Sequence, residues 1–131
     1  MKTKANKTGR TSGLTLIEVT LVIAVVLTLI SVLFIGANAY KEGSNRSFCL
    51  LNISKVQKAV RAYQNMYQKN FGDPILQERI AGPGKMLETV PACPSGGVYT
   101  WRGTIPPLDI AYLTCSLAAT REHQPSNTLG W

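Results

Sequence analysis

Three cysteines and a single histidine are the side chains of this 131-residue sequence that could form disulfides, bind a metal or take part in catalysis. Cys93 precedes one predicted strand and Cys115 ends the next, so antiparallel pairing of the two strands would bring their thiols together. A disulfide between them would contribute about 3 kcal/mol. There are two alternatives. One is a disulfide from Cys49 to the small head predicted at residues 71–131, and the other is three free thiols. Because the number of cysteines is odd, they cannot all pair within one chain.

No metal, cofactor or catalytic site is expected. His123 is the only histidine and no Cys-x-x-Cys pair is present, whereas zinc sites commonly use closely spaced pairs. The Gly-Pro-Gly-Lys segment at 82–85 lacks the Gly-Lys-Ser/Thr ending of a phosphate-binding loop. The acids are scattered without motif spacing, so the protein is not expected to be an enzyme: Glu78, Glu88 and Asp109.

Glu18 is the one charged residue in a long apolar stretch. The 22 residues from Val19 to Tyr40 carry no charge, and a helix of that length covers about 33 Å, which matches the hydrocarbon core of a bilayer. A carboxylate inside a membrane costs several kcal/mol, and less near the interface. Glu18 therefore either marks the membrane boundary or pairs with a cation, and we favour the pairing.

A basic leader, residues 1–13, precedes this stretch. Its cations give +4 of the formal charge of +7, and it has no acid: Lys2, Lys4, Lys7 and Arg10. Such a cluster usually stays on the cytoplasmic side of a membrane. An ordinary secretory signal is cut after its apolar stretch, but a small-residue site at Ser12-Gly13 would be cut before it. That cleavage would keep the helix and create an amine on Leu14, with which Glu18 of a neighbouring subunit can pair.

The run from Gly13 to Glu18, Gly-Leu-Thr-Leu-Ile-Glu, resembles the processing motif of type IV prepilins and type II secretion pseudopilins. Together with the leader and the apolar span, the resemblance covers about residues 1–40. It implies that a prepilin peptidase cleaves after Gly13 and methylates the amine of Leu14, and that Glu18 serves in subunit assembly. A Cys-Pro-x-Gly-Gly-x-Tyr stretch at 93–99, followed by a second Cys-Ser, is similar to a subset of pilin-like sequences.

The resemblance implies a structural function, as a subunit of a type IV pilus or a type II secretion pseudopilus. The expected partners are further copies of the chain, other pilin-like subunits, prepilin peptidase and an inner-membrane assembly platform with a motor ATPase. Before assembly the protein would cross the bacterial inner membrane once, with a cytoplasmic N-terminus and an extracytoplasmic head.

Two alternatives remain open. One is a permanently membrane-anchored protein with a ligand-binding head, which needs no processing at Gly13. The other is a minor pilin that binds DNA through its basic residues. These are more often a solvated face, so nucleic acid is not an expected partner: Lys55, Lys58, Arg61, Lys69, Arg79 and Lys85.

One very long helix is predicted from Leu14 to about Asn70. Residues 14–40 would form its transmembrane and filament-core half, and residues 41–70 its amphipathic half. The segment Gly43-Ser44-Asn45 marks a possible bend between them, because glycine costs a helix about 1 kcal/mol. The amphipathic half has one apolar stripe at helical spacing: Cys49, Ile53, Val56, Val60, Tyr63 and Tyr67.

Residues 71–131 are predicted to form a small head. It would contain a short helix at 74–81 and an antiparallel β-hairpin at about 98–115, with strands at 98–101 and 110–115. Because a hairpin alone is marginal in water, it should pack on the apolar stripe. The tail from Arg121 is polar and is expected to be loose. The predicted fold class is therefore α+β, with a long N-terminal α-helix packed by a small hairpin head.

Overall fold

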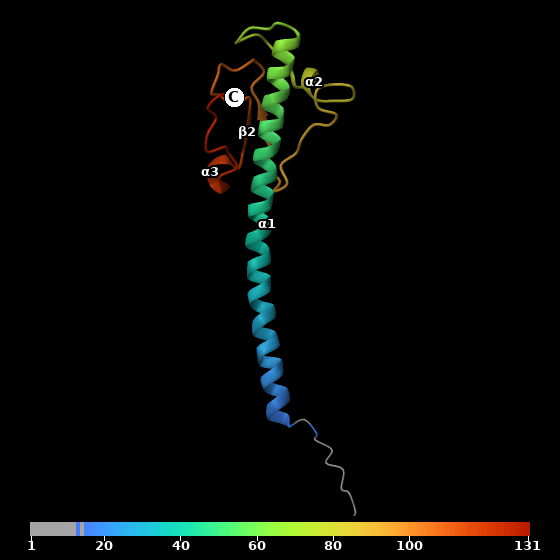
Figure 1. Ribbon diagram of the computed structural model, residues 1–131, viewed down its shortest axis with the longest axis vertical. Helices are drawn as coiled ribbons and strands as arrows, with labels where there is room; N and C mark the ends of the chain where they lie inside the picture. Colours follow the sequence, from blue (N-terminus) through green and yellow to red (C-terminus); the bar gives the residue numbers. More distant parts are fainter. Residues whose placement is uncertain (1–12, 14) are drawn as a thin grey trace, which may run out of the picture. The chain divides into compact units, whose positions relative to one another are not determined.

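The computed structural model describes residue 13 and residues 15–131 of the chain. The predicted leader, apart from Gly13, and the predicted methylation site Leu14 lie outside the described residues. The elements in the described part are α1 (Leu16–Met66), α2 (Gln77–Ile80), β1 (Tyr99–Trp101), β2 (Leu113–Cys115) and α3 (Ala118–Arg121) (Figure 1). Two compact units meet in the sequence between Asn38 and Ala39.

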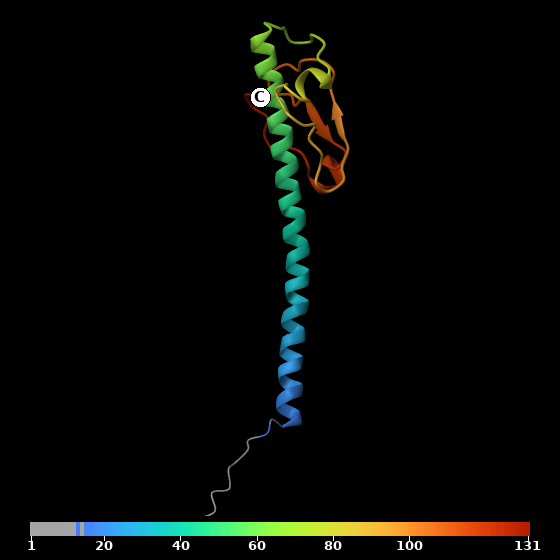
Figure 2. The same cartoon turned by 90° about the vertical axis from the view of Figure 1, so that its right-hand side faces the viewer.

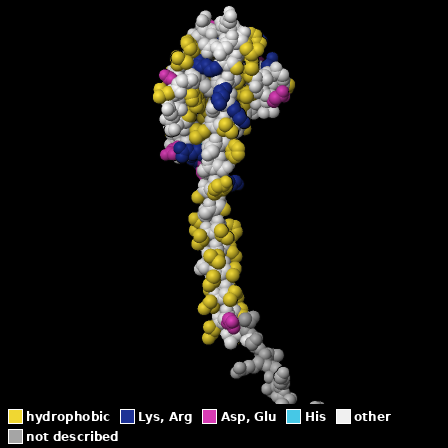
Figure 3. Space-filling view, in the orientation of Figure 1, with side chains coloured by type: hydrophobic (Ala, Val, Ile, Leu, Met, Phe, Trp, Pro, Cys, Tyr) yellow, Lys and Arg dark blue, Asp and Glu magenta, His cyan; other side chains and the backbone are white. Residues whose placement is uncertain are grey.

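The part of α1 in the N-terminal unit is apolar on all sides. Its large apolar side chains from Leu16 to Ile35 each expose between 40% and 86% of their surface, and Figure 3 shows them over the visible face of this part of the helix. The hydroxyls bond back to carbonyls of the same helix, as polar groups must in lipid: Thr20 to Ile17 at 2.9 Å, Thr28 to Val25 at 2.7 Å and Ser31 to Leu27 at 2.8 Å.

By length and composition, α1 is able to cross a membrane once. Its most apolar 18-residue window has a mean hydropathy of 2.9, and none of that window is buried within the described part of the chain. A cleaved signal sequence near an N-terminus meets the same criterion. The finding therefore supports one long apolar N-terminal helix, and the membrane span remains an interpretation of it.

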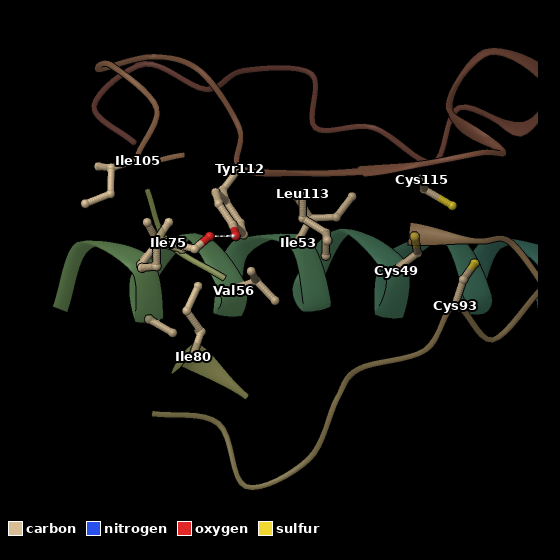
Figure 4. Close-up of a cluster of buried hydrophobic side chains, with 12 residues drawn as sticks. Cys49, Ile53, Val56, Ile75, Ile80, Cys93, Ile105, Tyr112, Leu113 and Cys115 are labelled. Carbon is tan, nitrogen blue, oxygen red and sulfur yellow. Dashed lines mark hydrogen bonds between the residues drawn. The ribbon is translucent and has the colours of Figure 1, made fainter. Parts of the chain in front are cut away.

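The C-terminal half of α1 contributes one face of the core of the second unit, as the apolar stripe predicted. Cys49, Ile53, Val56 and Val60 are buried, Tyr63 packs against their edge, and the last member of the predicted stripe is exposed. Side chains from the head cover this face (Figure 4). They come from four different segments: Ile75, Ile80, Ile105, Tyr112 and Leu113.

The predicted antiparallel hairpin is present, with Tyr99 opposite Cys115 and Trp101 opposite Leu113. Figure 2 shows the hairpin beside the C-terminal half of α1. Its strands are shorter than the predicted 98–101 and 110–115. The Gln57 side chain of α1 explains the late start of β2, because it accepts from the Tyr112 N–H at 2.8 Å and donates to the Ile110 carbonyl at 3.2 Å.

The predicted helix at 74–81 is confirmed for the residues of α2 and wrong for the segment before it. The segment before α2 is extended and pairs with residues 103–105 instead. Ile75 donates its N–H to the Gly103 carbonyl at 2.9 Å, and Ile105 donates to Asp73 at 2.9 Å. This pairing buries Ile75, whose exposed fraction is 1%, so burial and long-range hydrogen bonds outweigh the local proline signal.

Two predictions about α1 itself also need correction. The helix runs unbroken through Gly43-Ser44-Asn45, so these residues do not interrupt it. It ends at Met66 rather than near Asn70. Gln68 adopts a left-handed conformation with φ of 49°, and the next N–H, of Lys69, bonds to the Gln64 carbonyl at 2.9 Å. This is the hydrogen bond of a Schellman motif, which closes a helix.

The expectation of a loose tail from Arg121 is also wrong. The segment follows α3 and folds back onto the unit, where the side chain of His123 is fully buried. Thr128 donates its hydroxyl to the Asp109 carbonyl at 2.7 Å, and the N–H of Gly130 donates to the Asp109 carboxylate at 2.6 Å. Tertiary contacts therefore order a segment whose composition alone suggested solvent.

Candidate functional site

The predicted processing junction lies at the start of α1. Gly13 is exposed, and among the described residues no atom outside its chain neighbours lies within 4 Å of the position that a Cβ on it would take. Glu18 is exposed in the first turn of the helix. There its charge also suits the positive N-terminal end of the helix dipole. The cleavage and assembly roles of these residues stay predictions.

Thr15 caps the start of α1, a role that sequence reasoning missed. The hydroxyl oxygen of Thr15 accepts the backbone N–H of Glu18 at 3.3 Å, which caps the helix. The spacing Thr-x-x-Glu is that of a capping box, in which the glutamate reaches back to the cap residue. The signal for this cap was therefore present in the sequence.

A second constellation lies in the other unit, where Cys49, Cys93, Cys115 and His123 converge. Cys49 comes from α1, Cys93 from the loop before β1, Cys115 from the end of β2, and His123 from the segment after α3. Their sulfur and imidazole nitrogen atoms all lie within 4.8 Å of one another. Figure 4 shows the three cysteines together at one end of the core.

All four side chains of this cysteine–histidine cluster are buried. Cys49 and His123 have no exposed surface, and Cys93 and Cys115 expose 7% and 5%. The hairpin brings Cys93 and Cys115 together as predicted, but all three cysteines are free thiols in the structure. The Cys93–Cys115 disulfide therefore stays a prediction. Sequence reasoning missed the cluster because its members are far apart in the chain and no two of them have the close spacing of a metal-binding motif.

The surroundings of the three thiols differ. Burial raises the pKa of Cys93, but backbone N–H groups of Ser95 and Gly97 and the imidazole of His123 outweigh it and lower this pKa to about 7. Burial, together with the neighbouring thiols, raises the pKa of Cys49 to about 12, although the hydrogen bond from Tyr99 opposes the rise. Three thiolates cannot share this space without a positive charge between them.

His123 is oriented by a carboxylate. Its Nε2 lies 3.3 Å from Oε1 of Glu42, and its Nδ1 lies 3.4 Å from the sulfur of Cys93. With the proton on Nε2, the lone pair of Nδ1 points at the thiols. Glu42 is itself held, because the Ser95 hydroxyl donates to it at 3.2 Å and Arg121 lies 3.5 Å away.

Gly97 lets the backbone approach the sulfurs. A Cβ at this position would lie 2.7 Å from the sulfur of Cys115 and 3.2 Å from that of Cys93. Both distances are shorter than ordinary van der Waals contact, so a side chain here would displace the thiols. The second glycine of the Cys-Pro-x-Gly-Gly stretch is thus required by close packing against the cluster.

One of the basic residues of the DNA-binding alternative is engaged within the unit. Arg61 is half-buried, and its guanidinium donates to the carbonyls of Pro106, Pro107 and Trp131 at 2.8, 3.0 and 2.7 Å. Its predicted water-facing position is therefore wrong. Lys55 and the remaining basic residues of the alternative are exposed, as expected for a solvated face.

Comparison with known proteins finds no match: no protein-family model, no curated protein and no solved structure is similar to this chain.

Proposed function

We propose that the protein is a pilin-like filament subunit that is made as a precursor and processed between Gly13 and Leu14. The observation that carries the proposal is the order of three features along the chain: a basic leader, a small-residue junction and an apolar helix. Within the described residues, the apolar part of α1 has no covering partner in its own chain. Lipid would surround this apolar surface before assembly, and neighbouring subunits would bury it in the filament.

The chemistry of the junction supports the same function. Cleavage after Gly13 hydrolyses one peptide bond and frees the amine of Leu14, which the peptidase then methylates without removing its positive charge. Inside a packed apolar filament, that cation would pair with the carboxylate of Glu18 from a neighbouring subunit. Because an unpaired buried charge is strongly unfavourable, the pair would set the axial register between subunits.

The finer assignments belong to this proposal. The leader would stay in the cytoplasm and the head would lie outside it, at the bacterial inner membrane and then in a type IV pilus or type II secretion pseudopilus. The partners would be other pilin-like subunits, prepilin peptidase and the motor-driven assembly platform. The α+β architecture supports this interpretation, since a long helix and a small head suit a subunit whose helices form a filament core.

Mass spectrometry of the mature N-terminus tests the proposal. The full chain, isolated from cells with an active prepilin peptidase, should begin at Leu14 and carry one methyl group. A Gly13→Val variant should keep its leader, because the resemblance makes cleavage depend on the glycine. Gly43→Ala, a glycine substitution inside α1, is the matched control and should be processed normally. An intact leader on the unsubstituted chain would overturn the proposal.

A further inference from the structure

The cysteine–histidine cluster has the donor set and spacing of a closed metal site. We propose that Cys49, Cys93, Cys115 and His123 bind one Zn²⁺ through three thiolates and one imidazole. The site is independent of the filament function proposed above.

The spacing of the donor atoms suits zinc. Zn–S bonds of about 2.3 Å and a Zn–N bond of about 2.0 Å in a tetrahedron place the donors about 3.5–3.8 Å apart. The four donor atoms here all lie within 4.8 Å of one another, with Nδ1 of His123 3.4 Å from the sulfur of Cys93. Small side-chain movements would therefore complete the tetrahedron. A disulfide would use two sulfurs and leave the third sulfur and the imidazole unexplained.

The residues that surround the four donor side chains are of the kinds that orient and stabilise metal ligands. A metal-bound histidine usually donates its other ring N–H to a carboxylate, and Glu42 lies at that position, 3.3 Å from Nε2 of His123. The Tyr99 hydroxyl donates to the sulfur of Cys49 at 3.3 Å. Gly97 removes the side chain that would otherwise occupy the space beside the sulfurs of Cys93 and Cys115.

The donor types select the metal and its role. Thiolate and imidazole suit zinc, whereas calcium and magnesium prefer oxygen donors. All four positions are filled by buried side chains, so no coordination position is left for a substrate, and the site is structural. Binding displaces the protons that the three thiols still carry and leaves a centre of net charge −1, with neither oxidation nor reduction. It would link α1, the loop before β1, β2 and the C-terminal segment.

Metal analysis of the full chain in detergent tests the proposal directly. The chain should be purified under reducing conditions with an affinity tag that lacks histidine and cysteine. We expect one Zn²⁺ per chain by mass spectrometry of the elements. Replacement by Co²⁺ should give the visible bands of a tetrahedral site and a thiolate-to-metal charge-transfer band. Chelation should lower Tm by about 5 °C or more and expose all three thiols to alkylation.

Substitutions locate the site. Cys93→Ser and His123→Ala should each reduce Zn²⁺ affinity at least 100-fold, and Glu42→Gln, which keeps the imidazole ligand, should reduce it about 10- to 100-fold. Thr114→Val, an exposed change beside Cys115, is the control and should leave the affinity unchanged. Since the first measurement needs no variant, a variant that fails to fold leaves the test intact.

Two results would overturn the proposal. One is an unsubstituted chain, isolated from cells without reductant, in which two of the three cysteines are joined in a disulfide and no metal is bound. The other is a chain whose three thiols are all free but which takes up neither Zn²⁺ nor Co²⁺ at micromolar concentrations.

Discussion

Glu18 lies in the first turn of α1, and its proposed role is in subunit assembly. Its backbone N–H donates to the hydroxyl of Thr15 at 3.3 Å, so this cap depends on the Thr15 side chain and is kept when the Glu18 side chain is changed. Loss of such a cap costs about 1 kcal/mol. The assembly role rests on the charge of the carboxylate, which pairs with the freed amine of Leu14 in the proposed filament. Glutamine tests the charge alone, because it is equally compatible with a capping box but carries no charge.

Glu18→Gln should therefore be processed normally but assemble at least about tenfold less well, because a buried cation would lose its partner. Processing is measured by mass spectrometry of the N-terminus, and assembly by crosslinking of subunits in membranes and sheared fractions. Thr15→Ala is the control, since it weakens the cap and keeps the carboxylate, and it should assemble normally. Normal assembly of Glu18→Gln would show that Glu18 only marks the membrane boundary.

At the scale of the element, the two halves of α1 differ in how their apolar side chains are distributed and covered. The first exposes apolar side chains on every side, and the second buries one stripe against the head. Ile53 lies in the middle of that stripe with an exposed fraction of 1%, facing Leu113 of β2 in Figure 4. Leu51, two residues earlier on the same helix, has an exposed fraction of 47%.

Ile53→Ala should lower the free energy of unfolding by about 2–5 kcal/mol, because it leaves a cavity between α1 and the hairpin. Leu51→Ala removes a similar side chain from the exposed side and should change the free energy by about 0.5 kcal/mol or less. Both are measured by urea unfolding of the full chain in detergent, followed by tryptophan fluorescence. Equal effects from the two substitutions would mean that the hairpin does not pack on this stripe.

At the scale of the whole molecule, the C-terminal unit is held together by ties between segments distant in sequence. Its sheet has only two short strands, so contacts between distant segments are important for its stability. Arg61 is one of them, joining α1 to the carbonyls of Pro106, Pro107 and Trp131. The proposed zinc site is another, at the opposite end of the buried stripe.

Arg61→Lys should loosen the C-terminal segment, because one ammonium group cannot reproduce the geometry of the guanidinium. We expect amide hydrogen exchange at residues 124–131 to rise about tenfold or more, as about 1.5–3 kcal/mol of hydrogen bonding to a charged group is lost. Lys58→Arg, at an exposed position on the same helix, is the control and should leave exchange unchanged. Unaltered exchange in Arg61→Lys would show that the segment is held by other contacts.

The sequence by itself determined the long apolar helix, its buried stripe, the antiparallel hairpin and the α+β class. These features follow from local periodicity, since side chains three and four residues apart share a helix face and strand residues alternate. The predicted processing junction and the role of Glu18 also rest on the sequence, and they stay predictions.

Only the tertiary structure decided which distant residues meet. It placed His123 inside the core although the polar tail suggested solvent, extended the segment at Pro74 against residues 103–105, and turned Arg61 inward. The cysteine–histidine cluster depends on the same long-range packing. Its members contact one another because four segments pack on one stripe of α1, and spacing along the chain carries no information about such convergence.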